Sequence, residues 1–124
     1  MKKISIPLYV FFAAALSACG SDFEWFPDYI DEVPPVVTGS VGGINFSNNT
    51  TIYPTLPNSA TLIGTDLVSE PVSIYYTTNG STPTTSSNLY SQSFTVEDNT
   101  WTLIFFGEDK VGNKSNPITV KFKK

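Results

Sequence analysis

Apolar and polar residues alternate in short stretches along most of this 124-residue chain. The pattern is clearest at residues 118–123, where polar side chains separate Ile118, Val120 and Phe122. A two-residue period places successive side chains on opposite faces of a strand, so such stretches are typical of half-buried strands. Residues 72–77 repeat the pattern. After residue 18 no stretch has a sustained helical period, and the sequence therefore predicts an all-β fold.

Turn-forming residues divide the region 36–124 into about seven short strands. The strand-like segments are 36–38, 44–46, 50–53, 60–64, 72–77, 90–96, 101–107 and 118–122, with a turn expected at 39–43. About seven short strands separated by turns predict an immunoglobulin or fibronectin-III-like β-sandwich, here without a cysteine pair. The residues expected in its core are Ile74, Tyr76, Leu103, Phe105, Val120 and Phe122.

The first residues have a different pattern. Two lysines precede an apolar run at residues 4–16, which is shorter than the roughly 20 residues of a transmembrane helix and has the proportions of a signal peptide. Residues 16–20, Leu-Ser-Ala-Cys-Gly, resemble a bacterial lipoprotein box. The resemblance implies that residues 1–18 are a cleaved signal peptide and that Cys19 is acylated and anchored in the lipid bilayer. Gly20 after the cysteine resembles the sorting signal for the outer membrane of the cell envelope. An ordinary secretory signal or an uncleaved anchor is the alternative.

Residues 19–35 form an acidic, aromatic tether ahead of the sandwich at 36–124. Five of the eleven acidic residues lie there, together with Phe23, Trp25, Phe26 and Tyr29. Three interpretations remain open. The tether is a solvated spacer stiffened by its prolines, a docking segment that binds a partner through aromatics such as Trp25, or a segment whose aromatics pack back onto the domain.

Charge and composition narrow the function. The chain has seven lysines, eleven acidic residues and neither arginine nor histidine, for a net charge of −4. An acidic chain without arginine is unsuited to nucleic acid, because affinity for phosphates comes from basic side chains. Without histidine the commonest general base is missing, and with the single cysteine acylated a catalytic triad built on the abundant serines and threonines is unavailable. We therefore expect no enzymatic activity, no cofactor and no resident metal.

A run of β-branched and aromatic residues at 74–78 ends at a turn, and its motifs resemble a known family. The sequence at 74–84 is Ile-Tyr-Tyr-Thr-Thr-Asn-Gly-Ser-Thr-Pro-Thr, with Leu89-Tyr90 and Phe105-Phe106-Gly107-Glu108-Asp109-Lys110-Val111-Gly112-Asn113 after it. Over about residues 70–124 these motifs resemble the chitobiase/β-hexosaminidase C-terminal domain. The resemblance implies an immunoglobulin-like sandwich of the kind often appended to secreted bacterial proteins. The catalytic residues of chitobiase lie in a separate barrel domain, so no active site is transferred to this chain.

Two turns contain the polar residues that stand out. In the first, Asn79 and Gly80 tolerate positive φ and Pro83 fixes φ, which favours a structural turn. Asp109, Gly112 and Asn113 resemble the Asp-x-x-Gly-Asn turn of bacterial immunoglobulin-like domains, in which the aspartate caps the turn. A Ca²⁺ site at Asp109 and Asn113 is the alternative, because Ca²⁺ prefers oxygen ligands. Asn79 replaces the family's usual aspartate, which removes one carboxylate from that alternative.

The same alternation predicts a binding surface. If Leu103 and Phe105 fill the core, Ile104 and Phe106 point away from it, as does Tyr75 on the strand at 72–77, which in immunoglobulin-like sandwiches is often the neighbour of the strand at 101–107. Tyr75, Ile104 and Phe106 would then form an exposed apolar patch, unless Trp25, Phe26 or the first strand covers it. The expected function is that of a membrane-anchored, non-catalytic lipoprotein whose sandwich docks an unidentified partner protein or assembly in the cell envelope. The alternative is a carbohydrate-binding module held at the membrane, with a glycan as its ligand.

Overall fold

The computed structural model describes residues 30–98 and 101–123. The chain divides into two compact units, Met1–Val33 and Pro34–Lys124, and the fold below is that of the second. The expected signal peptide, Cys19, Trp25 and the tether as far as residue 29 lie outside the described residues. Among the described residues, the structure contains no helix long and apolar enough to cross a membrane.

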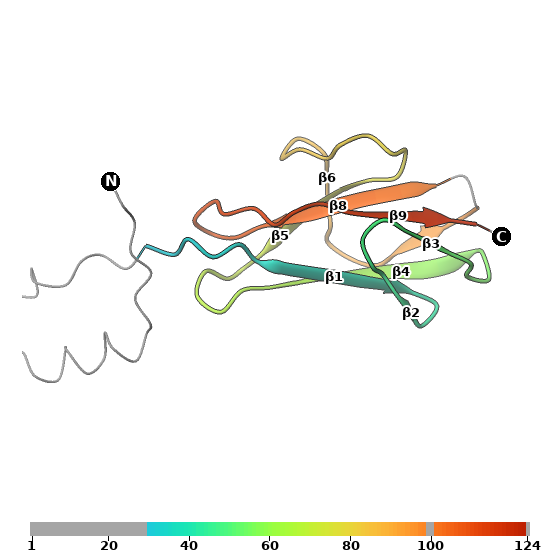
Figure 1. Cartoon of the computed structure of the whole chain (residues 1–124), viewed down its shortest axis with the longest axis horizontal. Coiled ribbons are helices and arrows are strands. Elements are labelled where there is room, and N and C mark those ends of the chain that lie inside the picture. Colours follow the sequence, from blue (N-terminus) through green and yellow to red (C-terminus); the bar gives the residue numbers. More distant parts are fainter. Residues whose placement is uncertain (1–29, 99–100, 124) are drawn as a thin grey trace, which may run out of the picture. The chain divides into compact units, whose positions relative to one another are not determined.

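The described part of the second unit consists of strands and their connections, without a helix. Its strands are β1 (Val36–Val41), β2 (Ile44–Asn45), β3 (Thr50–Ile52), β4 (Asn58–Thr65), β5 (Ser73–Thr77), β6 (Asn88–Leu89), β7 (Phe94–Val96), β8 (Thr102–Glu108) and β9 (Ile118–Phe122). They form a four-stranded sheet of order β2-β1-β4-β7 and a five-stranded sheet of order β3-β9-β8-β5-β6. Figure 1 shows the two layers, with β1 and β4 in one and β8 and β9 in the other. The predicted immunoglobulin-like β-sandwich is confirmed.

Antiparallel pairing dominates both sheets. β1 pairs with β4 from Val36 opposite Thr65 to Val41 opposite Ala60, and β5 pairs with β8 from Ser73 opposite Glu108 to Thr77 opposite Ile104. The exception is β3, which runs parallel to β9 at the edge of the five-stranded sheet. The prediction that the strands carrying Tyr75 and Phe106 are neighbours is therefore confirmed.

The core lies between the two sheets. Five of the six predicted core residues are buried, and the sixth, Tyr76, is half-buried and packs against the core. Phe46 also packs inward, and its ring centroid lies 6.1 Å from that of Phe105 and 6.0 Å from that of Phe122. On β5, Tyr76 stacks on Phe94 of β7 with ring centroids 4.8 Å apart. Aromatic contacts of this kind stabilise a core beyond the area they bury.

Three boundaries differ from the prediction. The chain was expected to turn at 39–43, but β1 continues through Gly39 to Val41 and the turn falls at residues 42 and 43. A side chain at Gly39 would bring its Cβ within 2.6 Å of Phe46, so glycine here makes room for an aromatic ring rather than ending the strand. The segment predicted as a strand at 90–96 forms a strand only at Phe94–Val96. The two-residue strand at Asn88–Leu89 was not predicted, and with it the described region contains nine strands.

Candidate functional site

Phe106 lies on the face of the five-stranded sheet that points away from the core. Leu103 and Phe105, its neighbours on β8, belong to the buried core cluster, whereas Phe106 does not. It pairs across the strands with Tyr75, and the two rings stack with centroids 5.6 Å apart and an interplanar angle of 26°. The alternation in the sequence therefore predicts the correct face for both aromatic side chains.

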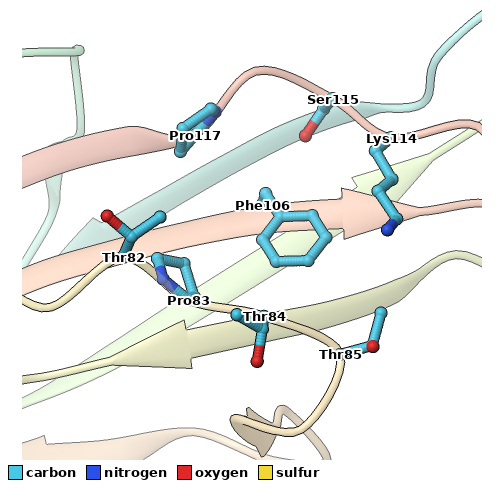
Figure 2. Close-up of a pocket in the computed structure, with 8 residues that line it drawn as sticks. All are labelled: Thr82, Pro83, Thr84, Thr85, Phe106, Lys114, Ser115 and Pro117. Carbon is cyan, nitrogen blue, oxygen red and sulfur yellow. The ribbon is translucent and has the colours of Figure 1, made fainter.

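The predicted exposure of the patch is wrong for Phe106. Phe106 is only 6% exposed, and Tyr75 and Ile104 are half-buried. The reason is that two loops reach over the sheet: residues 82–85 of the β5–β6 connection and residues 114–117 of the β8–β9 connection flank the ring (Figure 2). Loop cover of this kind is a tertiary contact that a strand's own period cannot predict. Trp25, also assigned to the surface, lies outside the described residues.

The two loops and Phe106 enclose a hollow of about 320 Å³, called here the Phe106 hollow. Its lining combines three apolar rings with hydroxyl groups and one lysine: Thr82, Pro83, Thr84, Thr85, Phe106, Lys114, Ser115 and Pro117 (Figure 2). The Lys114 ammonium lies 3.6 Å from a carboxylate oxygen of Glu108, which offsets part of its charge. An apolar surface with a few convergent polar groups is the usual composition of a small-molecule site.

Hydrogen bonds fix both loops. The Thr84 N–H donates to Ser87 Oγ over 2.9 Å, and the Ser86 N–H donates to Thr84 Oγ1 over 3.2 Å. On the other side, the Gly107 N–H donates to Ser115 Oγ over 2.8 Å, and the Ser115 N–H returns a bond to the Gly107 carbonyl. The walls of the Phe106 hollow are therefore formed before any ligand binds.

A second hollow of about 220 Å³ lies beside the end of β5 and the β5–β6 connection, and is called here the polar hollow. Hydroxyl and amide groups dominate its lining, which is Tyr76, Thr77, Thr78, Asn79, Ser81, Ser86, Ser87 and Asn88. Sequence reasoning did not find either hollow. The signal in the sequence that could have indicated them is the density of serine and threonine around Pro83, a segment that was predicted only as a structural turn.

The first predicted turn has the geometry of a structural element. Gly80 has a φ of +81°, and its N–H donates to the Thr102 carbonyl over 3.0 Å. Asn79 Oδ1 accepts hydrogen bonds from the N–H and the hydroxyl of Ser81, over 3.1 Å and 2.7 Å. Pro83 is buried. Because Asn79 and Ser81 also line the polar hollow, this turn positions a wall of it.

Asp109 organises the second turn. One carboxylate oxygen accepts the N–H groups of Val111 and Asn113, each over 2.9 Å, and the other accepts the Asn113 side-chain amide over 2.7 Å. Gly112 has a φ of +97°. Burial alone raises the pKa of the Asp109 carboxyl, but the bonds from the Asn113 side chain and from the backbone of Asn113, Val111 and Gly112 outweigh it, so the pKa is lowered from 3.8. These are the contacts of a capped turn.

A second carboxylate approaches this turn from the β4–β5 connection. The carboxylates of Asp66 and Asp109 lie within 4.8 Å of each other, and the Lys110 N–H donates to the Ser69 carbonyl over 3.0 Å. Asp66 accepts the N–H groups of Val68 and Ser69, each over 2.8 Å. Each aspartate therefore caps its own loop, and the expected role of Asp109 in a turn accounts for its contacts.

Comparison with known proteins identifies the domain. A family model described as the chitobiase/beta-hexosaminidase C-terminal domain matches residues 55–119. No curated protein and no solved structure matches the chain. The matched region runs from just before β4 into β9 and contains every residue that lines the Phe106 hollow and the polar hollow. The chain belongs to the chitobiase/beta-hexosaminidase C-terminal domain family.

Proposed function

We propose that this protein is a non-catalytic carbohydrate-binding module held at the bacterial cell envelope by a lipid anchor. The observation that carries the proposal is the Phe106 hollow, in which the exposed Pro117 and the largely buried rings of Phe106 and Pro83 lie beside hydroxyl groups. A sugar ring presents an apolar C–H face and a rim of hydroxyls, and needs both kinds of partner. Hydroxyl side chains suit that rim because each can both donate and accept a hydrogen bond.

A protein-docking role has less support. A protein interface needs a broad apolar centre with a polar rim, and in the predicted patch of Tyr75, Ile104 and Phe106 the loops bury Phe106 almost completely. What remains accessible beside it is a concave site of about 320 Å³, a size suited to a small ligand rather than to a flat partner surface.

The lining of the hollow also supports a binding role over a catalytic one. Glycoside hydrolysis generally uses two carboxyl groups on either side of the bond that is cut. Among the described residues that line the Phe106 hollow there is no aspartate or glutamate, and Glu108 nearby is paired with Lys114. The hydroxyl groups of the lining can orient a sugar but have no partner to activate them as nucleophiles.

The anchor is proposed from the sequence alone. Acylation of Cys19 after cleavage of residues 1–18 would hold the mature chain in the outer membrane, because each buried CH₂ of an acyl chain contributes about 0.8 kcal/mol. The tether at 19–35 would then separate the sandwich from the bilayer.

Retention on insoluble polysaccharides tests the proposal. The full-length protein, purified in a detergent without a sugar headgroup, is mixed with chitin, cellulose and peptidoglycan, and the bound fraction is measured. The double variant Thr82→Ala/Thr85→Ala removes two exposed hydroxyls of the Phe106 hollow and should weaken retention about tenfold. The matched control Thr61→Ala/Thr65→Ala removes two exposed hydroxyls of β4, in the other sheet, and should retain full binding. If none of the three polymers retains the protein, the proposal is contradicted.

A further inference from the structure

We propose that the Phe106 hollow and the polar hollow together bind one extended, uncharged glycan of at least two sugar units. This inference rests on the proposed carbohydrate-binding function and adds the ligand's minimum length and its charge. One unit lies against Phe106, and the next lies among the hydroxyl and amide groups of the polar hollow.

The first argument is that one segment lines both hollows. Residues 82–85 line the Phe106 hollow, and Ser81 with residues 86–88 line the polar hollow. Segment 81–88 is therefore a shared wall, called here the rib. The two linings meet at the bonds Ser81–Thr82 and Thr85–Ser86, so a ligand longer than one ring can extend from one hollow toward the other.

The second argument is that the rib is held in place. At its start the Gly80 N–H donates to the Thr102 carbonyl over 3.0 Å, and Thr77 Oγ1 donates to the Ser81 carbonyl over 2.5 Å. Just past its end, the Tyr90 N–H donates to the Ile74 carbonyl over 2.8 Å. Within the rib, the Ser87 N–H donates to the Thr84 carbonyl over 2.9 Å. A wall fixed at both ends keeps the two hollows at a constant spacing, and such preorganisation lowers the entropy cost of binding a ligand that fills both.

The third argument is that the hollows differ in chemistry. Three rings line the Phe106 hollow, whereas Tyr76 is the one ring among the described residues that line the polar hollow. Tyr76 also stacks on Phe94, so one face of its ring is already used. The Phe106 hollow thus suits the apolar face of a pyranose, and the polar hollow suits hydroxyl or amide substituents. A single sugar unit would satisfy one set of groups and leave the other to water.

The fourth argument concerns charge. The described residues that line the polar hollow are all neutral, and Lys114 in the Phe106 hollow lies 3.6 Å from Glu108. The chain itself carries a net charge of −4. An acidic polysaccharide would find one cation in the two linings, Lys114, whose charge Glu108 already offsets in part, and would be repelled by the protein's net charge. The combined site therefore selects a neutral glycan.

The test is the dependence of affinity on chain length. N-acetylglucosamine, its β-1,4 dimer and its tetramer are titrated into the full-length protein, in a detergent without a sugar headgroup, and the dissociation constants are measured by calorimetry. Glucose, cellobiose and cellotetraose form a second neutral series, and oligogalacturonate is the charged comparison. In the series that binds, we expect the affinity to rise at least about tenfold from monomer to tetramer, because the second unit adds hydrogen bonds in the polar hollow.

A variant of the polar hollow separates this inference from the proposed function. Ser86→Ala/Asn88→Ala removes two exposed polar side chains that line it, and should reduce the affinity for the tetramer to that for the monomer. Ser59→Ala/Thr61→Ala, on the exposed face of β4, is the matched control. Equal affinities for monomer and tetramer, an unaltered length dependence in the variant, or tighter binding of oligogalacturonate would each overturn the inference and leave carbohydrate binding intact. Absence of binding to every sugar would overturn both.

Discussion

Tyr75 and Phe106 face each other across β5 and β8 on the outer side of the five-stranded sheet, with their ring centroids 5.6 Å apart. The pair joins the sheet to the loops that cover it, because Phe106 forms part of a hollow with residues 82–85 and 114–117. Phe106, Tyr75 and the covering loops therefore form a small packed cluster outside the main core.

This relationship predicts unequal costs of truncation. Phe106→Ala should lower the free energy of unfolding by about 3 kcal/mol, as for a buried core aromatic, since its side chain is 6% exposed. Tyr75→Ala should cost about 1 kcal/mol, because Tyr75 is half-buried and loses mainly the ring stacking. Urea denaturation measures both, and Tyr53→Ala, with a side chain 67% exposed, is the control that should change little. A Phe106→Ala variant as stable as the Tyr53→Ala variant would show that the loops do not bury the ring.

Substitution of Gly80 should destabilise the fold through backbone strain rather than through steric crowding. Its φ is +81°, and a Cβ would lie an ordinary 3.5 Å from Thr102. Gly80→Val should therefore cost about 1–3 kcal/mol through backbone strain, whereas Gly80→Asn should cost less, because asparagine tolerates the left-handed region. Melting temperatures of the two variants make the comparison. If Gly80→Val keeps the wild-type melting temperature yet loses glycan retention, the turn acts directly in binding and is not a structural element.

Asp109 should make stability depend on acid pH. Its pKa in the folded protein lies below 3.8, so its contribution is fully present above that pH and is lost as the pH falls through the folded pKa. Asp109→Asn should be less stable than wild type at pH 7, by about 1–3 kcal/mol, because the buried turn loses charge-assisted bonds. The difference should shrink toward pH 2. Urea denaturation between pH 7 and pH 2 gives the two curves, and parallel curves would refute the role assigned to this carboxylate.

Gly107 should be sensitive to size, because it lies where the two sheets approach. A Cβ there would lie 2.5 Å from Val37 Cγ1 and 3.0 Å from Val72 Cγ1. Gly107→Ala should therefore destabilise the fold by about 1–3 kcal/mol. A double-mutant cycle with Val37→Ala provides the check, since removing the Val37 methyls should recover part of the loss. Additive costs in the cycle would mean that the contact with Val37 is not the cause.

Cys19 lies outside the described residues, and its lipidation is tested by substitution. Cys19→Ser should abolish metabolic labelling with radioactive palmitate and leave the protein unprocessed or soluble, because the sulfur that would take the diacylglyceryl group is gone. The labelled band is followed by gel electrophoresis of membrane fractions. Label that persists in the variant would mean that the modified residue is another one.

The sequence predicts the sandwich well because its strands follow a local rule. The two-residue period of β8 places Leu103 and Phe105 in the core and Phe106 outside it, as observed. The same period says nothing about what covers Phe106, because Pro83 and Pro117 come from separate loops. Gly39 is a second example: it was expected to end a strand, but it makes room for the ring of Phe46. The residues next to Gly39 or Phe46 in the sequence do not predict this contact. The candidate site could not be predicted because it is made of such loop contacts.

The register of β1 also has a mechanical consequence. β1 begins at one end of the sandwich and β9 finishes at the opposite end (Figure 1), while β1 is held to β4 by six consecutive residue pairs. A tension applied at Val36 through an anchored Cys19 would pull along the strand and load all of those pairs together, in shear. A pull across the strand would instead open them one after another. Under the proposed function, in which the domain would hold a polymer while lipid-anchored, a load directed along β1 would be borne by its pairing with β4.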